Sequence, residues 1–139
     1  MSTESNLTIA QGIYSAFGQG NIPAILDVFA DDVELHEPPG GTPPFTGVYH
    51  GLDGAATFFR NLVETVDVLA MEPQEFVAQG DVVVVLGHYR FRPKTTGIPY
   101  DTDWAMVWRF RDGKVSKFQV HYDTATEAAA FSGMTVERA

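Results

Sequence analysis

The sequence of 139 residues contains no cysteine. Disulfide frameworks and thiolate metal sites are therefore excluded. The chain also has no apolar run of the ~20 residues that a membrane-spanning helix needs. Basic residues are few, since nine Lys and Arg stand against 18 Asp and Glu, for a formal net charge of −9. Because nucleic acids and anionic membranes attract basic surfaces, neither is an expected partner.

The N-terminal segment is polar and lacks the basic and apolar regions of a secretory signal peptide. A chain without cysteine is also compatible with a reducing compartment, so we expect a cytoplasmic protein. The length predicts a single domain over residues 1–139. A domain of this size buries roughly 68 % of its unfolded surface, which is enough for a core without metals. We expect neither a metal nor another cofactor.

Helical spacing of apolar residues dominates the beginning of the chain, and strand patterns dominate the second half. Helices on one side of a mostly antiparallel sheet form an α+β fold. The segment between Pro38 and Gly51 is rich in Pro and Gly and predicts a long loop. The expected helices lie at about 7–17, 22–29, 53–66 and 125–131, and the expected strands at 33–37, 68–78, 82–91, 100–110 and 115–122.

Turn and cap residues separate these elements. Asn21 is suited to cap the second helix, and Pro73 interrupts one strand. Asp112-Gly113 is the strongest hairpin signal in the chain. Thr124-Ala-Thr-Glu127 has the pattern of a capping box for the last helix.

One strand is apolar on both faces. Val82 to Leu86 contains no polar residue, so we expect both faces of the sheet to be covered. Helices can cover only one of them. The other face predicts a homodimer interface, because two-fold dimers are the commonest assemblies.

Glu37 is the leading candidate for chemistry. It ends an alternating run in which Val33, Leu35 and Glu37 share one face of a strand, while Glu34 and His36 point to the other. A carboxylate on an apolar face is costly unless it is satisfied or used. Glu37 therefore fits a general base at the mouth of an apolar cavity. The alternative is a solvated or ion-paired carboxylate at the rim, and a register slip of one residue would exchange it with His36.

Several segments together resemble a known superfamily. In their order and spacing, these residues resemble the nuclear-transport-factor-2-like (NTF2-like) superfamily, in its SnoaL-like and ketosteroid-isomerase-related branch. The segments are Ile13–Asn21, Val28–Val33, Glu37-Pro38 leading to Gly47–Gly51, Thr96-Gly97, Trp104–Phe110, Asp112–Val115 and His121–Thr124.

The resemblance implies a cone-shaped curved sheet around helices, with an apolar pocket at the open end. In the steroid-isomerase branch a carboxylate at the end of the first strand moves a proton next to a carbonyl, and a helix Tyr stabilises the oxyanion. Glu37 matches that base and Tyr14 matches that donor. A second donor of the branch, a protonated Asp, falls at or near Met106 in this chain, which removes half of the oxyanion hole. Tyr14 has an alternative role as an ordinary core residue.

Alternation along the last strands predicts the walls of a pocket for a small hydrophobic ligand. Ordinary core packing would have the same composition. The expected wall residues are Phe17, Phe58, Trp104, Met106, Trp108, Phe118 and Tyr122.

Other candidates come from further branches of the same superfamily. Its polyketide cyclases use an Asp on the last strand, which points to Asp123, although Asp123 can instead serve the N-terminus of the last helix. Scytalone-dehydratase-like chemistry uses His and Tyr, for which His88 and His121 are available. Neither these nor His36 and His50 show the spacing of a metal site.

Two functions follow from the sequence. The first is a cofactor-free isomerase, cyclase or dehydratase that acts on a small hydrophobic carbonyl compound, with Glu37 as base and Tyr14 as donor. The second is a binder of an apolar ligand, or a dimeric interaction module of the same fold, without turnover. Met106 at the second donor position favours the binder.

Overall fold

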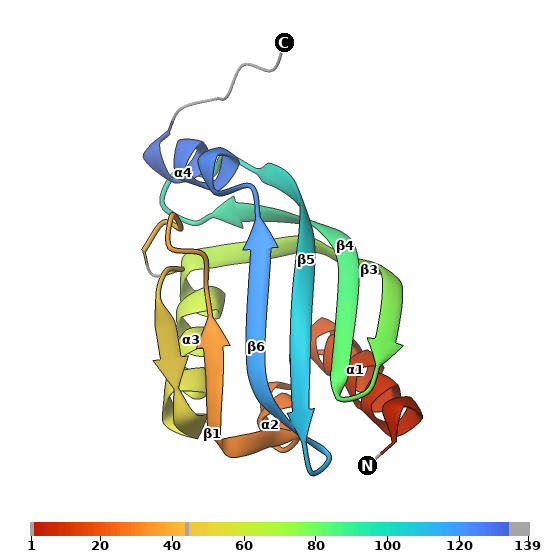
Figure 1. The fold of residues 1–139 in the computed structure, drawn as a ribbon. Coiled ribbons are helices and arrows are strands. Elements are labelled where there is room, and N and C mark those ends of the chain that lie inside the picture. Colours follow the sequence, from red (N-terminus) through yellow and green to blue (C-terminus); the bar gives the residue numbers. More distant parts are fainter. Residues whose placement is uncertain (1, 44, 134–139) are drawn as a thin grey trace.

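The structure is a computed structural model that describes residues 2–43 and 45–133. These residues form a curved sheet with helices packed into its concave side (Figure 1). In chain order the elements are α1 (Thr3–Gly18), α2 (Ile22–Leu26), β1 (Phe29–His36), β2 (Val48–His50), α3 (Gly51–Thr65), β3 (Val66–Gln79), β4 (Val82–Pro93), β5 (Tyr100–Arg111), β6 (Lys114–Tyr122) and α4 (Thr124–Ser132).

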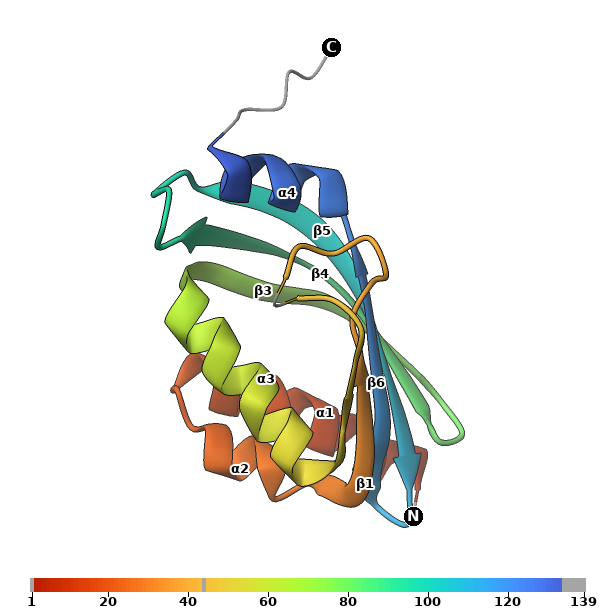
Figure 2. The ribbon, with the colours of Figure 1, turned by 90° about the vertical axis from the view of Figure 1, so that its left-hand side faces the viewer.

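The sheet has the strand order β2-β1-β6-β5-β4-β3. β1 runs parallel to β6 and every other neighbouring pair is antiparallel. Helices α1, α2 and α3 lie on one side of the sheet, and α4 lies across one end (Figure 2). The predicted α+β class and the cone-like, mostly antiparallel sheet are confirmed.

The local signals in the sequence act where expected. The Asn21 side chain caps α2 by accepting a hydrogen bond from the backbone N–H of Ala24 at 3.3 Å. Asp112 and Gly113 both have positive φ, 52° and 79°, as a tight hairpin turn of this kind requires. The register of the β3–β4 pair shifts just after Pro73, because proline cannot donate to the ladder.

Two expectations about local structure are wrong. The predicted loop contains a short strand, β2, which pairs with the end of β1 and extends the sheet by one edge strand. Thr124 does not cap the last helix. Asp123 does so, one residue earlier, and accepts a hydrogen bond from Thr126 N at 3.1 Å. This cap moves Glu127 beyond the capping position, and its side chain is buried inside the protein.

Gly87 in β4 makes room for an aromatic stack. A Cβ atom at this position would lie 2.4 Å from a ring carbon of Trp104 and 2.5 Å from the Glu72 carbonyl oxygen. The absence of a side chain lets the Trp104 ring lie against the sheet backbone. Trp104 in turn stacks on Tyr14, with ring centroids 5.7 Å apart. The stack joins α1 to the sheet.

The convex face of the sheet carries an apolar patch. Cross-strand pairing places Val77 beside Val84 and Val107, and Leu86 beside Ala105. Val77 is 59 % exposed and Leu86 is 38 % exposed. In β4 the chain neighbours Val83 and Val85 are fully buried, so these side chains face away from helices α1–α3, which lie on the concave side in Figure 2. Helices α1, α2 and α3 therefore leave this patch uncovered.

Candidate functional site

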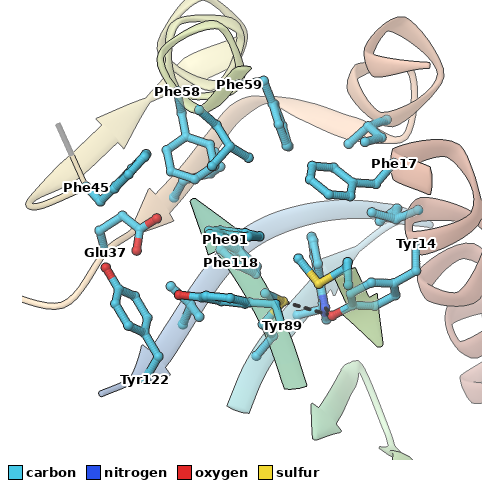
Figure 3. A pocket seen from close by; sticks show the side chains of 18 of the residues that line it. Tyr14, Phe17, Glu37, Phe45, Phe58, Phe59, Tyr89, Phe91, Phe118 and Tyr122 are labelled. Atoms are coloured by element: carbon cyan, nitrogen blue, oxygen red, sulfur yellow. Dashed lines mark hydrogen bonds between the residues drawn. The ribbon is translucent and has the colours of Figure 1, made fainter. Parts of the chain in front are cut away.

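A cavity lies between the concave face of the sheet and the helices (Figure 3). Its volume is about 700 Å³ when the solvent at its mouth is included. Hydrocarbon and aromatic side chains dominate its walls. The lining residues are Ile13, Tyr14, Phe17, Ile25, Leu35, Glu37, Phe45, Phe58, Phe59, Leu62, Met71, Tyr89, Phe91, Met106, Trp108, Phe118, Val120, Tyr122 and Glu127.

Trp104 is the exception among the expected wall residues, since all the others line the cavity. Its ring is 3 % exposed and lies behind Tyr14, in the space left by Gly87. The alternation along β5 predicts its face correctly. Alternation does not predict that a helix side chain stands between Trp104 and the cavity.

Glu37 follows β1 directly and its side chain enters the cavity (Figure 3). Its backbone N–H donates to the Gly47 carbonyl at 2.9 Å, which holds the chain extended for one residue beyond the strand. The Oε2 atom is buried and has no hydrogen-bond partner. Burial in this apolar surrounding, and second the nearby charge of Glu127, raise the pKa of Glu37 to about 8.

Glu127 is a second carboxyl in the cavity that the sequence analysis placed only in a capping box. It projects from α4 and is 1 % exposed. Its Oε1 atom accepts a hydrogen bond from Thr42 N at 2.9 Å, which ties α4 to the loop after β1. Burial raises the pKa of Glu127 to about 7. Ala130 lies three residues later on the same helical face and is also buried, but an alanine at this spacing does not by itself predict that a carboxyl is buried.

Two tyrosines lie close to Glu127: Tyr122 lines the cavity, and Tyr100 lies outside its lining. Their buried hydroxyls approach the Glu127 carboxyl but complete no hydrogen bond of good geometry. Burial, the carboxyls and their mutual proximity raise the pKa of both phenols far above the usual value. The Tyr122 hydroxyl points toward the Glu37 carboxyl in Figure 3. Four polar groups therefore lie close together, and three of them hold a buried oxygen that completes no hydrogen bond.

Tyr14 lies at the other end of the cavity from Glu37 (Figure 3). Its hydroxyl donates to the Met106 sulfur at 3.0 Å and accepts a hydrogen bond from Trp108 Nε1 at 2.9 Å. Burial raises its pKa well above the usual value. Met106 lies where the resemblance implied a second hydrogen-bond donor. In this structure its sulfur instead accepts the hydrogen bond from Tyr14.

Asp123 does not line the cavity. Its carboxyl accepts hydrogen bonds from the backbone N–H and the hydroxyl of Thr126, at 3.1 and 2.6 Å. The hypothesis of a catalytic Asp123 is therefore corrected to a helix cap. An N-cap carboxylate satisfies backbone N–H groups that the helix leaves unpaired.

The histidines also lie outside the cavity. His88 bridges Asp101 and Asp103, each at 2.9 Å, and the hydrogen bond that it donates to Asp101 is the main reason its pKa is raised. His36 pairs with Glu34 at 2.9 Å, and His121 is exposed. His88 and His121 are therefore not placed to act on a ligand in this cavity.

Within residues 2–43 and 45–133, no group of three or more His, Asp or Glu is arranged to hold a metal ion. None of the described helices combines the length and the apolar character needed to cross a membrane.

Comparison with known proteins agrees with this architecture. The model of the SnoaL-like domain matches residues 10–118. An NTF2-like protein of Burkholderia xenovorans is 34 % identical, with 94 % of this chain and 98 % of that one covered and a TM-score of 0.84.

The chain belongs to the SnoaL-like family, within the NTF2-like superfamily.

Two further structures show what this SnoaL-like protein is similar to. TerC, co-crystallised with polyporic acid, is 26 % identical, with 92 % of this chain and 98 % of TerC covered and a TM-score of 0.80. A SnoaL-like polyketide cyclase, itself of uncertain assignment, from Mesorhizobium loti is 21 % identical, with 88 % and 100 % covered and a TM-score of 0.73. At that identity the second likeness concerns the fold alone.

Proposed function

We propose that this protein binds a small hydrophobic carbonyl compound in its cavity and catalyses cofactor-free proton transfer on it. Isomerisation, cyclisation and dehydration are reactions of this class. Glu37 is the group that takes a proton from carbon next to the carbonyl. The observation that carries the proposal is the buried Glu37 carboxyl, whose Oε2 atom has no partner and whose side chain enters an apolar cavity.

The environment of Glu37 suits a general base. A carboxylate that loses water becomes more basic, and a base works best when its pKa lies near the operating pH. With a pKa of about 8, Glu37 is a far stronger base than a solvated glutamate. The apolar walls also exclude water, which would otherwise compete for the proton.

Tyr14 is proposed as a donor to a ligand oxygen at the far end of the cavity. Its hydroxyl hydrogen points to the thioether of Met106, which is a weak acceptor that a second oxygen of the ligand, other than the reacting carbonyl, can replace. The hydrogen bond from Trp108 to the Tyr14 oxygen makes the hydroxyl a better donor. A ligand with an oxygen there and an acidic C–H near Glu37 would span the cavity.

The test is solvent exchange at carbon. The protein in D₂O is incubated with 2-tetralone or 2-indanone, and loss of the proton next to the carbonyl is followed by NMR. We expect saturable exchange, and a decrease of about 10²–10⁴-fold in Glu37→Gln, which is the usual contribution of a general base. Glu64→Gln changes an exposed carboxyl on α3 and is the matched control. Equal exchange by the wild type and Glu37→Gln contradicts the proposal.

The second candidate function is ligand binding without turnover. It is favoured by the Tyr14 hydroxyl, which is already engaged at both its hydrogen and its oxygen. Polyporic acid, with which TerC was crystallised, is a suitable probe. A ligand recovered unchanged, together with no exchange on either ketone, would support the binder.

We also propose a homodimer through the convex face of the sheet. Val77 and Leu86 form the most exposed part of its apolar patch. A charge in the centre of such an interface would be desolvated without a partner. Leu86→Lys is therefore expected to give a monomer in sedimentation velocity, while Val63→Lys, an exposed position on α3, keeps the dimer. A wild-type protein that is monomeric at about 100 µM in sedimentation velocity would contradict this interface.

A further inference from the structure

The carboxyl end of the cavity contains more unpaired polar groups than a general base alone requires. Glu37 Oε2 is buried without a partner, and the Tyr122 hydroxyl, which also lines the cavity, approaches Glu127 without completing a hydrogen bond of good geometry. Buried polar atoms are nearly always hydrogen-bonded, so each unpaired one calls for an explanation. Glu127 lies among them and has one oxygen fixed by Thr42 N. Groups that converge in this way on an open cavity fit a ligand that supplies the missing partners.

We propose that Glu127 is a second acid–base residue of this site, which donates a proton to the ligand oxygen while Glu37 takes one from the adjacent carbon. Tyr122, which also lines the cavity, donates a hydrogen bond to the same ligand oxygen. This inference rests on the proposed function and specifies its substrate class. The substrate is an uncharged ketone whose oxygen lies next to the acidic C–H, at the carboxyl end of the cavity.

The step conserves protons and electrons. The Glu37 carboxylate removes the proton, and the C–H electron pair becomes a C=C bond. The π electrons of the carbonyl take the proton of the Glu127 carboxylic acid, which leaves a neutral enol and a Glu127 carboxylate. Return of the proton from Glu37 to the same carbon, with return of the enol proton to Glu127, gives solvent exchange and restores the starting state. In an unsaturated ketone the enol is a conjugated dienol, and return of the proton to the far carbon of the dienol gives the isomer.

This arrangement does not depend on an oxyanion hole. Tyr14 lies at the opposite end of the cavity from Glu37 (Figure 3). Met106 lies at the position that corresponds to the second donor of the steroid-isomerase branch, and it accepts a hydrogen bond instead of donating one. A neutral enol carries no charge that such a hole would stabilise. Direct protonation of the carbonyl oxygen by Glu127, at the end of the cavity where Glu37 lies, therefore replaces stabilisation of an oxyanion.

The two carboxyls hold one proton between them near neutral pH. The charge of Glu127 adds to the raised pKa of Glu37, so the shared proton lies more often on Glu37, at about 8, than on Glu127, at about 7. The reactive form, with Glu37 ionised and Glu127 protonated, is the less populated of the two. The groups that face the pair are the phenols of Tyr89, Tyr100 and Tyr122, which remain protonated in this range. The pair is thus able to donate and accept in one turnover.

The cavity also selects against anions. None of the residues that line it, all within the described part of the chain, is Lys, Arg or His. An anionic ligand would meet two acidic side chains and no positive charge. A neutral ketone avoids this repulsion.

The experiment compares pH profiles of exchange on 2-tetralone. A site with one shared proton gives a bell-shaped profile, because the base must be ionised while the acid is protonated. Glu127→Gln retains an oxygen that can accept from Thr42 N, so the tie to the loop is preserved. We expect the rate to decrease about 10²-fold and the bell to become a single rise at lower pH, because Glu37 then loses its acidic neighbour.

The outcomes separate this inference from the proposed function. If Glu37→Gln retains exchange, the proposed function is wrong. If Glu37→Gln loses exchange but Glu127→Gln keeps the wild-type rate and the bell, only the role of Glu127 is wrong. Phenylpyruvate, an anionic ketone with an acidic C–H, is expected to exchange at the uncatalysed rate; efficient catalysis on it would contradict the neutral substrate class.

A measurement on the wild type covers the case in which Glu127→Gln does not fold. Carboxyl-carbon NMR of the two residues should show two shared titration steps for each carboxyl. Independent single steps would show that the carboxyls do not share a proton and would overturn the inference.

Discussion

Replacement of Glu37 by glutamine is expected to raise the midpoint of thermal unfolding by roughly 10 °C at pH 8.5 and to leave it almost unchanged at pH 5. The pKa of Glu37 is about 8 in the folded protein, compared with 4.5 for an unperturbed glutamate side chain. Between these values the folded state holds a proton that the unfolded state releases. Stability is therefore greatest below pH 4.5 and decreases as the pH rises through about 8.

The size of the effect follows from the shift. One pKa unit corresponds to 1.36 kcal/mol, so the raised pKa of Glu37 costs about 5 kcal/mol of unfolding free energy at pH 8.5. Glutamine has nearly the same shape and never becomes charged, which removes this cost. Part of the effect belongs to Glu127, because its charge destabilises the charge of Glu37.

Differential scanning calorimetry of the wild type and Glu37→Gln from pH 5 to pH 9 measures this difference. Glu64→Gln should show no comparable increase at pH 8.5, since that side chain is exposed. A difference between the wild type and Glu37→Gln that is the same at pH 5 and pH 8.5 would show that Glu37 titrates as a solvated carboxyl. The same substitution that removes catalysis would thus stabilise the protein, as is common at active sites.

Trp108→Ala is expected to lower the free energy of unfolding by about 3–5 kcal/mol, which is the usual cost of replacing a buried Trp by Ala. The side chain is 4 % exposed. Its ring lies 4.4 Å from that of Phe118 and 5.9 Å from that of Tyr14, measured between centroids. The substitution enlarges an existing cavity and also removes the donor to the Tyr14 hydroxyl.

Trp108→Phe separates packing from hydrogen bonding. It keeps an aromatic ring but lacks the N–H group, so it should cost about 1 kcal/mol for the hydrogen bond plus a smaller packing loss. The midpoints of urea unfolding give both values. A loss below about 1 kcal/mol in Trp108→Ala would show that this ring does not carry the packing of the cavity wall.

Periodicity in the sequence was sufficient for much of the architecture. Alternation placed Glu37 on the apolar face, and the cavity wall contains Met106, Trp108 and Phe118 as predicted. Both signals are local, because a strand repeats its facing every two residues. Turn residues such as Asp112 likewise act through their own backbone conformation.

The carboxyl pair could not be predicted in this way. Glu127 was assigned to a capping box by its local pattern, but Asp123 caps the helix and turns Glu127 inward. Its meeting with Glu37 depends on where α4 crosses the end of the sheet. No periodic pattern contains that information.

Local sequence patterns, namely the alternation of apolar residues and the turn and cap residues, were enough to predict the α+β class, the facing of the strands and the acidic residue at the end of β1. The curvature of the sheet and the packing of α1 and α4 decided the rest. They placed Tyr14 between Trp104 and the cavity, and they brought Glu37 and Glu127 together from distant parts of the chain. The reason is physical. Burial raises the pKa of both carboxyls, and the charge of Glu127 raises that of Glu37 further; both effects depend on neighbours in space, which packing determines.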